Sequence, residues 1–174
     1  MHAQNVAFGG DKVTFTQRGF QRYLILAVFV PVSCFSLACQ QSRTDTESET
    51  RRPLTSFRQV LTSSTTSLSV HPDQGVTIPV RIENPGPETW PSTGQFPVNA
   101  SYKWFNGATM LPIEGERTPL PGPVAPNQAV NVNLRVVAPT QAGNFTLRIT
   151  LVQEAVAWFM IKSNTFLELP VTVE

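Results

Sequence analysis

The sequence predicts an all-β fold, a single antiparallel β-sandwich of seven or eight strands at residues 67–174. Three observations lead to this prediction. Several runs alternate apolar and polar side chains with a period of two, which is the pattern of strands with one buried face. The chain holds 15 prolines, and those between the runs break helices and mark turns. No segment of useful length shows a helical period or the βαβ alternation of a parallel sheet.

The domain is predicted to begin with a short strand, followed by a longer one. Residues 67–70 predict a short opening strand, which the turn residues of 71–75 end. The run 75–84 places four apolar side chains on one face, namely Val76, Ile78, Val80 and Ile82. Pro79 on the opposite face has no N–H to donate to a strand ladder, so we expect it at a sheet edge or at a bulge.

A hairpin is predicted next. Residues 97–107 carry alternating inward positions at Val98, Ala100, Tyr102 and Trp104. The strand ends in Asn106-Gly107, a dipeptide that favours a tight hairpin turn, and residues 108–115 form the returning strand. We expect Trp104 in the core, because sandwiches commonly bury a tryptophan on a central strand.

Four further strands complete the predicted sandwich. Residues 117–120 form a short strand, which Pro-rich turns follow. Residues 129–137 repeat the alternation with Val130, Val132, Leu134 and Val136 on one face. Residues 144–151 do the same with Phe145, Leu147, Ile149 and Leu151, which makes this the central strand of the plan. Residues 165–173 supply the last strand.

Residues 1–38 predict a secretory signal peptide. The apolar run 23–38 follows two arginines and is followed by polar residues. It is shorter than the roughly 20 apolar residues that a membrane-spanning helix needs, and it contains Pro31. Residues 1–16 are longer and less basic than the opening of a signal peptide needs, so we expect translation to start later, for instance at Val13.

Cys39 is the predicted lipid attachment site. Ser36-Leu37-Ala38-Cys39 resembles the lipobox of bacterial lipoproteins, in which the cysteine is diacylated and becomes the new N-terminus. Ala38 fits that pattern, whereas the leucine usual at the third position before the cysteine is replaced by Ser36. The alternatives are an ordinary signal peptide cut near Ala38, or an uncleaved anchor, with Cys39 incidental. This resemblance implies a cell-envelope protein that is exported and anchored to a membrane.

Residues 39–66 are expected to hold the lipid attachment site and a flexible linker. Hydroxyl and charged side chains dominate residues 41–66, and few apolar side chains offset the entropy of ordering the chain. Phe57, Val60 and Leu61 lie at helical spacing, so the alternative is one turn of helix docked on the domain.

Composition excludes several function classes. A formal net charge of +1 gives no basic stripe for nucleic acid, so we expect no nucleic-acid partner. The two cysteines both precede residue 40, so the body of the chain has no thiol chemistry. No metal-ligand spacing, phosphate-binding glycine loop or nucleophile elbow appears, and we expect no metal and no cofactor.

Several motifs of the predicted domain resemble an immunoglobulin-like module. They are Ile82-Glu83-Asn84-Pro85-Gly86, Thr89-Trp90, Ser101-Tyr102-Lys103-Trp104, the segment 114–121, Val124-Ala125-Pro126, Leu151-Val152-Gln153-Glu154 and Trp158-Phe159. Such modules accompany bacterial surface-polysaccharide glycosyltransferases and methyltransferases as accessory domains. A more distant likeness is to the tryptophan-containing Ig-like domain of autophagy receptors. The resemblance implies an Ig-like sandwich. We expect no catalytic domain in this chain, so a role in polysaccharide synthesis does not follow from the resemblance.

Five residues form the predicted ligand or partner surface: Trp90, Arg117, Glu154, Trp158 and Phe159. Aromatic rings can stack on the apolar face of a sugar while nearby polar groups bind its hydroxyls. For Trp158, which lies just past a strand end, both a core position and an exposed position remain open. Glu114 and Glu116 share strand parity and could serve hydrolysis, but an ion pair with Arg117 is the preferred interpretation, and we expect no catalytic residue.

These inferences combine into one expectation of function. The chain is expected to be a lipid-anchored envelope protein whose Ig-like domain is a non-catalytic binding or assembly module for an envelope polysaccharide or a partner protein. One alternative is a purely structural lipoprotein that spaces or stabilises a larger membrane complex. A remote alternative is a glycan-active hydrolase.

Overall fold

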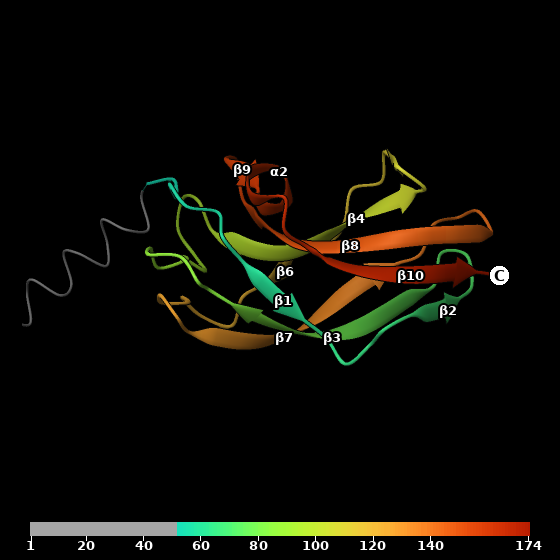
Figure 1. Cartoon of the computed structure of the whole chain (residues 1–174), viewed down its shortest axis with the longest axis horizontal. Coiled ribbons are helices and arrows are strands. Elements are labelled where there is room, and N and C mark those ends of the chain that lie inside the picture. The colour runs from blue at the N-terminus through green and yellow to red at the C-terminus, as the bar shows by residue number, and fades with distance from the viewer. Residues whose placement is uncertain (1–51) are drawn as a thin grey trace, which may run out of the picture. The chain divides into compact units, whose positions relative to one another are not determined.

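The computed structural model describes residues 52–174, which fold as a two-layer, nearly all-β sandwich (Figure 1). One sheet has the strand order β1-β3-β7, and the larger sheet follows the path β2-β10-β8-β4-β5, with β6 added to β4 and β9 to β8. The elements are β1 (Val60–Thr62), β2 (Leu68–Val70), β3 (Gly75–Glu83), β4 (Val98–Asn106), β5 (Thr109–Met110), β6 (Thr118–Pro119), β7 (Ala129–Val137), β8 (Gly143–Gln153), β9 (Ala157–Trp158), α2 (Phe159–Ser163) and β10 (Leu167–Val173).

The strand count and the pairing differ from the prediction in detail. The described residues form ten strands where seven or eight were expected, because β5, β6 and β9 span two residues each and are too short to show a period. The returning strand expected at residues 108–115 shrinks to β5. One pair is parallel, with Val171 of β10 opposite Leu68 of β2, so the larger sheet is mixed. Alternation reveals which face of a strand is buried but not the direction of its neighbour.

The core lies between the two sheets and follows the predicted alternation. The inward side chains of the long strands are buried, among them Ile78, Val80, Ile82, Val98, Ala100, Tyr102, Trp104, Leu134, Val136, Leu147, Ile149 and Leu151. The prediction that Trp104 belongs to the core is confirmed. Two side chains of β4 also join the sheets directly, because Val137 of β7 donates its N–H to the Tyr102 hydroxyl at 3.0 Å and accepts the Trp104 indole N–H at 3.0 Å.

The N side of Pro79 faces an unpaired stretch of β3 beyond the last residue pair with β1, which is the local edge that was predicted. Its carbonyl accepts a hydrogen bond from the Ser63 hydroxyl, on the side of β3 where the ladder with β1 has ended. Its missing N–H therefore removes no ladder bond.

Residues 52–59, called the strap below, differ from the expected flexible linker. Leu54 and Gln59 are buried, and β1 follows directly and pairs with β3. The strap amide of Leu54 donates to the buried Gln153 side chain, 99 positions later, at 2.9 Å. The Gln59 side chain accepts the Leu151 N–H and donates to the Thr150 hydroxyl. It therefore binds β8 at the two residues that lie between the part paired with β10 and the part paired with β9. The ordered domain thus begins before residue 67, and residues 57–61 are extended, not helical.

The predicted signal peptide, Cys39 and the first part of the expected linker lie outside the described residues. Within residues 52–174, no helix is long and apolar enough to cross a membrane.

Candidate functional site

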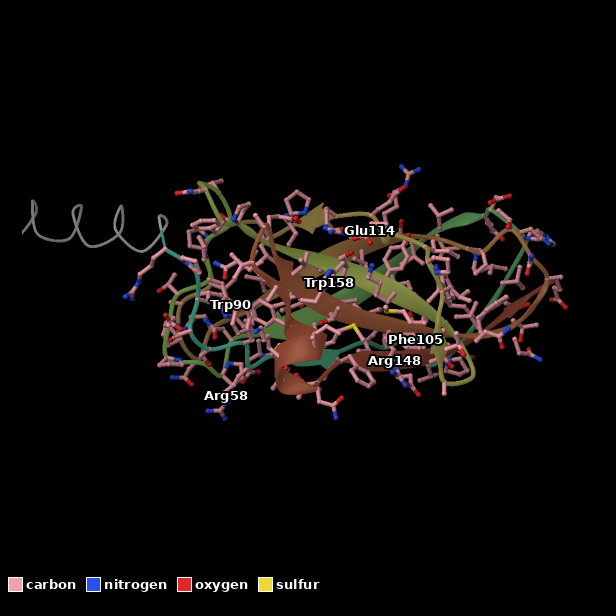
Figure 2. All side chains as sticks on the ribbon, turned by 90° about the horizontal axis from the view of Figure 1, so that it is seen from above. Arg58, Trp90, Phe105, Glu114, Arg148 and Trp158 are labelled. Atoms are coloured by element: carbon pink, nitrogen blue, oxygen red, sulfur yellow. The ribbon has the colours of Figure 1, made fainter. Side chains whose placement is uncertain are left out.

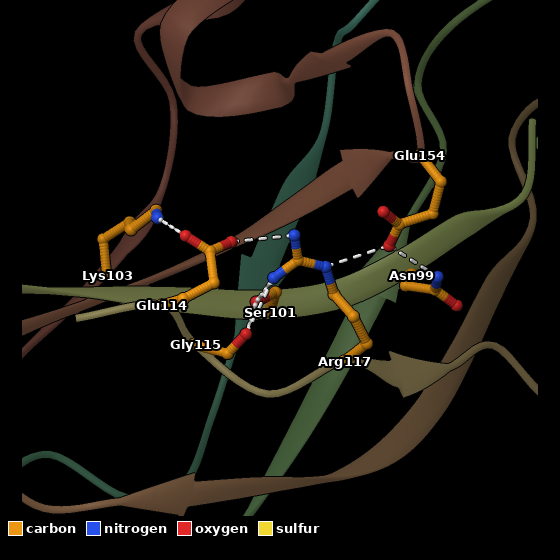
Figure 3. Close-up of polar contacts among 7 residues, drawn as sticks. All are labelled: Asn99, Ser101, Lys103, Glu114, Gly115, Arg117 and Glu154. Atoms are coloured by element: carbon orange, nitrogen blue, oxygen red, sulfur yellow. Dashed lines mark hydrogen bonds and ion pairs between the residues drawn. The ribbon is translucent and has the colours of Figure 1, made fainter. Parts of the chain in front are cut away.

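A polar cluster built around one aromatic ring lies on the outer face of the larger sheet. We call it the Trp158 cluster, and its members are Asn99, Lys103, Glu114, Arg117, Glu154 and Trp158. Figure 2 looks onto this face, where Trp158 lies over the sheet, and Figure 3 shows the polar contacts. It brings together three of the five predicted surface residues: Arg117, Glu154 and Trp158.

Arg117 is the centre of the cluster, because all three guanidinium nitrogens are used. Its Nε donates to Glu154 Oε1 at 2.9 Å, and its Nη2 lies 2.8 Å from Glu114 Oε1. Its Nη1 donates to the Gly115 carbonyl at 2.7 Å. Asn99 of β4 donates to the same Glu154 oxygen at 2.9 Å (Figure 3). The predicted ion pair of Arg117 is therefore confirmed.

Lys103 and Glu114 form the second half of the cluster. The Lys103 Nζ lies 2.5 Å from Glu114 Oε2, and only 12% of the lysine side chain is exposed. The hydrogen bond from Lys103 holds the pKa of Glu114 below its usual value, although partial burial acts in the opposite direction. Glu114 therefore remains an anion over a wide pH range and lacks the raised pKa of a general acid.

Trp158 is half-buried and contacts both cations of the cluster. The Lys103 Nζ lies 4.3 Å from the centre of the Trp158 ring, and the Arg117 guanidinium carbon lies 4.7 Å from it. Such cation–π contacts stabilise by about 0.5–1 kcal/mol each at exposed sites. The choice left open by the sequence is thus resolved: Trp158 lies on the sheet surface, over charged groups.

Three local features position these side chains. Asn99, Ser101 and Lys103 occupy alternate positions of β4 whose neighbours point into the core, so they face outward together. The segment carrying Glu114 and Arg117 lies against β4 because position 115 is a glycine. A Cβ on Gly115 would lie 2.2 Å from the Tyr102 carbonyl oxygen.

The turn between β8 and β9 supplies the remaining members. Ala155 adopts φ 58°, in the left-handed region, and this turn folds β9 back so that Trp158 pairs with Val152. Glu154 is held at the start of the turn by a hydrogen bond from its N–H to the Pro97 carbonyl.

Trp90 and Phe159 belong to the core, so their prediction as surface residues is wrong. Both are at most 1% exposed, and their rings meet edge to face with centroids 5.5 Å apart. Phe57 of the strap also meets Phe159 edge to face, with ring centroids 5.2 Å apart. The helix α2 turns Phe159 and Met160 inward directly after the surface residue Trp158.

The two carboxylates considered for hydrolysis are bound to different cations. Glu116 pairs with Arg135 at 3.2 Å, whereas Glu114 pairs with Lys103 and Arg117. Among residues 52–174, no group of three or more acidic, histidine or cysteine side chains could hold a metal ion.

A hollow of about 360 Å³ lies next to the cluster and shares Glu114 with it. Its lining combines apolar and polar side chains, including Tyr102, Ile113, Glu116 and Pro139. This volume is within the range of small-molecule sites.

A second cation on the same face is also covered by aromatic rings. Arg148 lies directly opposite Lys103 in the strand register, an unfavourable arrangement for like charges. Glu168 neutralises Arg148 at 2.8 Å, and the guanidinium carbon lies 4.1 Å from the Phe105 ring centre and 4.4 Å from that of Phe166. Each of the two opposed cations thus has its own carboxylate and aromatic partners.

Comparison with known proteins gives a distant structural likeness. No protein-family model and no curated protein matches the chain. The crystal structure of a CARDB domain from Pyrococcus furiosus, in complex with di-metal ions, is 13% identical over 67% of this chain and 92% of that one, with a TM-score of 0.39. The solution structure of the same domain is 14% identical over 66% of this chain and 93% of that one, with a TM-score of 0.39.

A family 123 glycoside hydrolase from Clostridium perfringens is 9% identical and covers 67% of this chain and 27% of that one, with a TM-score of 0.32. At these scores the likeness carries no argument about ligand or activity, and the fold assignment rests on the strand pairing described above. The resemblance to accessory domains of glycosyltransferases and methyltransferases stays a prediction.

Proposed function

We propose that this chain is a lipid-anchored envelope protein whose β-sandwich is a non-catalytic binding module, with the Trp158 cluster as its binding surface for an envelope polysaccharide. The observation that carries the proposal is the half-buried Trp158 ring, which lies among amide, cationic and carboxylate groups on the open face of the larger sheet. The anchor rests on the sequence that ends at Cys39.

Charge balance within the cluster favours a sugar over an anionic ligand. The two cations Lys103 and Arg117 are matched by the two carboxylates Glu114 and Glu154, so the cluster has no net charge. Paired charges still offer hydrogen-bond donors and acceptors to hydroxyl groups, and an aromatic face next to them suits the C–H face of a sugar ring. The neighbouring hollow gives a second sugar unit room to bind.

Replacement of Trp158 by Ala tests the binding surface. Loss of two cation–π contacts should lower the free energy of unfolding by about 1–2 kcal/mol, which leaves the sandwich folded. Binding on a glycan array should fall by about tenfold or more, because a stacking ring contributes on the order of 1.4 kcal/mol.

The matched control for this test is Phe166→Ala. Phe166 is also a half-buried ring against a cation on the larger sheet, but it lies outside the cluster. Phe166→Ala should keep glycan binding. Equal binding by Trp158→Ala and the parent protein would contradict the proposed surface.

A second function is favoured by a different observation. Every charged side chain of the cluster already has a partner, and these pairs join β4 to two loops, so the cluster also serves as a structural connection. If this structural connection is the only role of the cluster, the protein is a structural lipoprotein that spaces or stabilises a membrane complex. No binding to any glycan, together with one stoichiometric protein partner in a pull-down from native membranes, would favour this alternative, and detected glycan turnover would favour the hydrolase.

The anchor has its own test. The parent protein should incorporate a fatty-acid analogue in cells, and the Cys39→Ala variant should not. Label retained in Cys39→Ala would contradict lipid attachment at this residue.

A further inference from the structure

Two basic side chains stand apart from the ion pairs of the domain. Residues 52–174 contain eight lysines and arginines. Six of them are in ion pairs: Arg52, Arg81, Lys103, Arg117, Arg135 and Arg148. Among the described residues, Arg58 and Lys162 have no carboxylate partner, and both are exposed.

These two cations lie on neighbouring segments. Arg58 belongs to the strap and Lys162 to α2, and the segments are joined where Phe57 packs against Phe159. The Gln59 side chain also donates to the Thr165 carbonyl just after the helix. Figure 2 shows Arg58 pointing away from the sandwich, on the edge that also carries the short helix.

An exposed apolar side chain adjoins each cation along the chain: Val60 lies two positions after Arg58, and Ile161 directly precedes Lys162. Val60 is 43% exposed and Ile161 is 68% exposed, and they are two of the three large hydrophobic side chains that are exposed in residues 52–174. The extended chain turns Gln59 inward and both Arg58 and Val60 outward. In α2, Phe159 and Met160 are buried, whereas Ile161 and Lys162 face solvent. We call Arg58, Val60, Ile161 and Lys162 the basic-apolar patch.

We propose that the basic-apolar patch rests on a lipid bilayer with anionic headgroups. Unpaired Lys and Arg side chains bind phosphate groups, and apolar side chains beside them enter the interface. This inference rests on the proposed function, because the lipid anchor would bring the patch to the membrane.

The length of chain between anchor and strap agrees with this placement. Only residues 40–51 separate Cys39 from the strap, and 12 residues reach at most about 45 Å when fully extended. If residues 39–66 were all linker, as composition predicts, the domain would be far less restricted. Because the strap is hydrogen-bonded to Gln153 and Glu88, the anchor draws the edge that carries Arg58 toward the bilayer.

A fluorescent label at position 161 tests the proposal in the full-chain protein, purified from membranes and reconstituted into vesicles. The body after Cys39 has no cysteine, so Ile161→Cys introduces one site for an environment-sensitive dye. The parent chain, taken through the same labelling, reports any signal from Cys34 or Cys39.

The matched control is Met110→Cys. Met110 is the third exposed large hydrophobic, at 49% exposure, and it pairs with Phe105 at the end of β4 opposite the end that lies near β9. In vesicles of phosphatidylcholine with phosphatidylglycerol, the dye at position 161 should shift to the blue, and the dye at position 110 should keep its emission in water.

Charge removal completes the test. In the labelled protein, Arg58→Gln and Lys162→Gln should each lower the ratio of inserted to exposed dye about fivefold, and added salt should do the same. Vesicles of phosphatidylcholine alone should give no blue shift.

The outcomes separate the patch from the anchor. If the dye at position 161 has the same emission as the dye at position 110 on anionic vesicles, the proposed membrane contact is wrong. The same result is expected if the patch binds an acidic protein and not a bilayer, so it overturns the proposal in that case too. Mass spectrometry of the same preparation reads acylation of Cys39. An unacylated chain whose dye still shifts on anionic vesicles would support the patch and contradict the proposed anchor.

Discussion

Replacement of the buried Gln153 by Met probes the attachment of the strap to the sandwich. The Gln153 side chain is 0% exposed, accepts the Leu54 N–H at 2.9 Å and donates to the Phe96 carbonyl at 3.1 Å. Methionine has a similar length and volume, so no large cavity forms, but it leaves one donor and one acceptor without partners. Each unsatisfied buried group costs about 1–3 kcal/mol, so the free energy of unfolding should fall by about 2–6 kcal/mol.

Urea unfolding and hydrogen exchange of the Leu54 amide measure this effect. For a domain of this size the loss corresponds to a decrease in Tm of roughly 10 °C. The control is Gln141→Met, which makes the same change on an exposed turn and should alter stability by less than about 0.5 kcal/mol. The reasoning is refuted if Gln153→Met is as stable as the control, or if the Leu54 amide of the parent exchanges at an unprotected rate.

Two further predictions concern the cluster and the strap. Gly115→Ala should reduce stability by about 1–3 kcal/mol in urea unfolding, because its Cβ would press on the Tyr102 carbonyl, whereas Gly122→Ala, with open space around it, should be neutral. Burial raises the pKa of Glu88, but hydrogen bonds from Thr55 and Ser56 and the Arg52 charge outweigh it and lower the pKa below 4.5. Glu88 therefore stabilises the fold above pH 4.5, and this contribution is lost as the pH falls through the lowered pKa. Glu88→Gln should show a weaker loss of stability on acidification, and unchanged acid dependence would contradict this role.

The long strands could be predicted from the sequence because their information is local. Each inward residue of β3, β4, β7 and β8 is two positions from the next, so the alternation of apolar and polar side chains predicts the buried face. The alternation also placed Trp104 in the core. The missing N–H of Pro79 predicted that its N side faces an unpaired stretch, which is equally local information.

The end of β8 could not be predicted in the same way. The β8–β9 turn uses Ala155 at φ 58°, so it lacks the glycine or asparagine that usually marks a left-handed position. The single helical turn of α2 is too short to show a period. As a result Trp158 and Phe159, adjacent in the chain, were assigned to one surface although only Trp158 lies there.

Sequence alone thus determined the alternating faces, the all-β class and the pairing of Arg117 with a carboxylate. Tertiary structure alone decided that a polar segment becomes the strap, and that Lys103, Arg117 and Trp158 meet. The physical reason is the distance along the chain between partners. Leu54 is hydrogen-bonded to Gln153, and Arg117 to Glu154, which are 99 and 37 positions away in the chain. The sequence around either partner therefore does not indicate the contact.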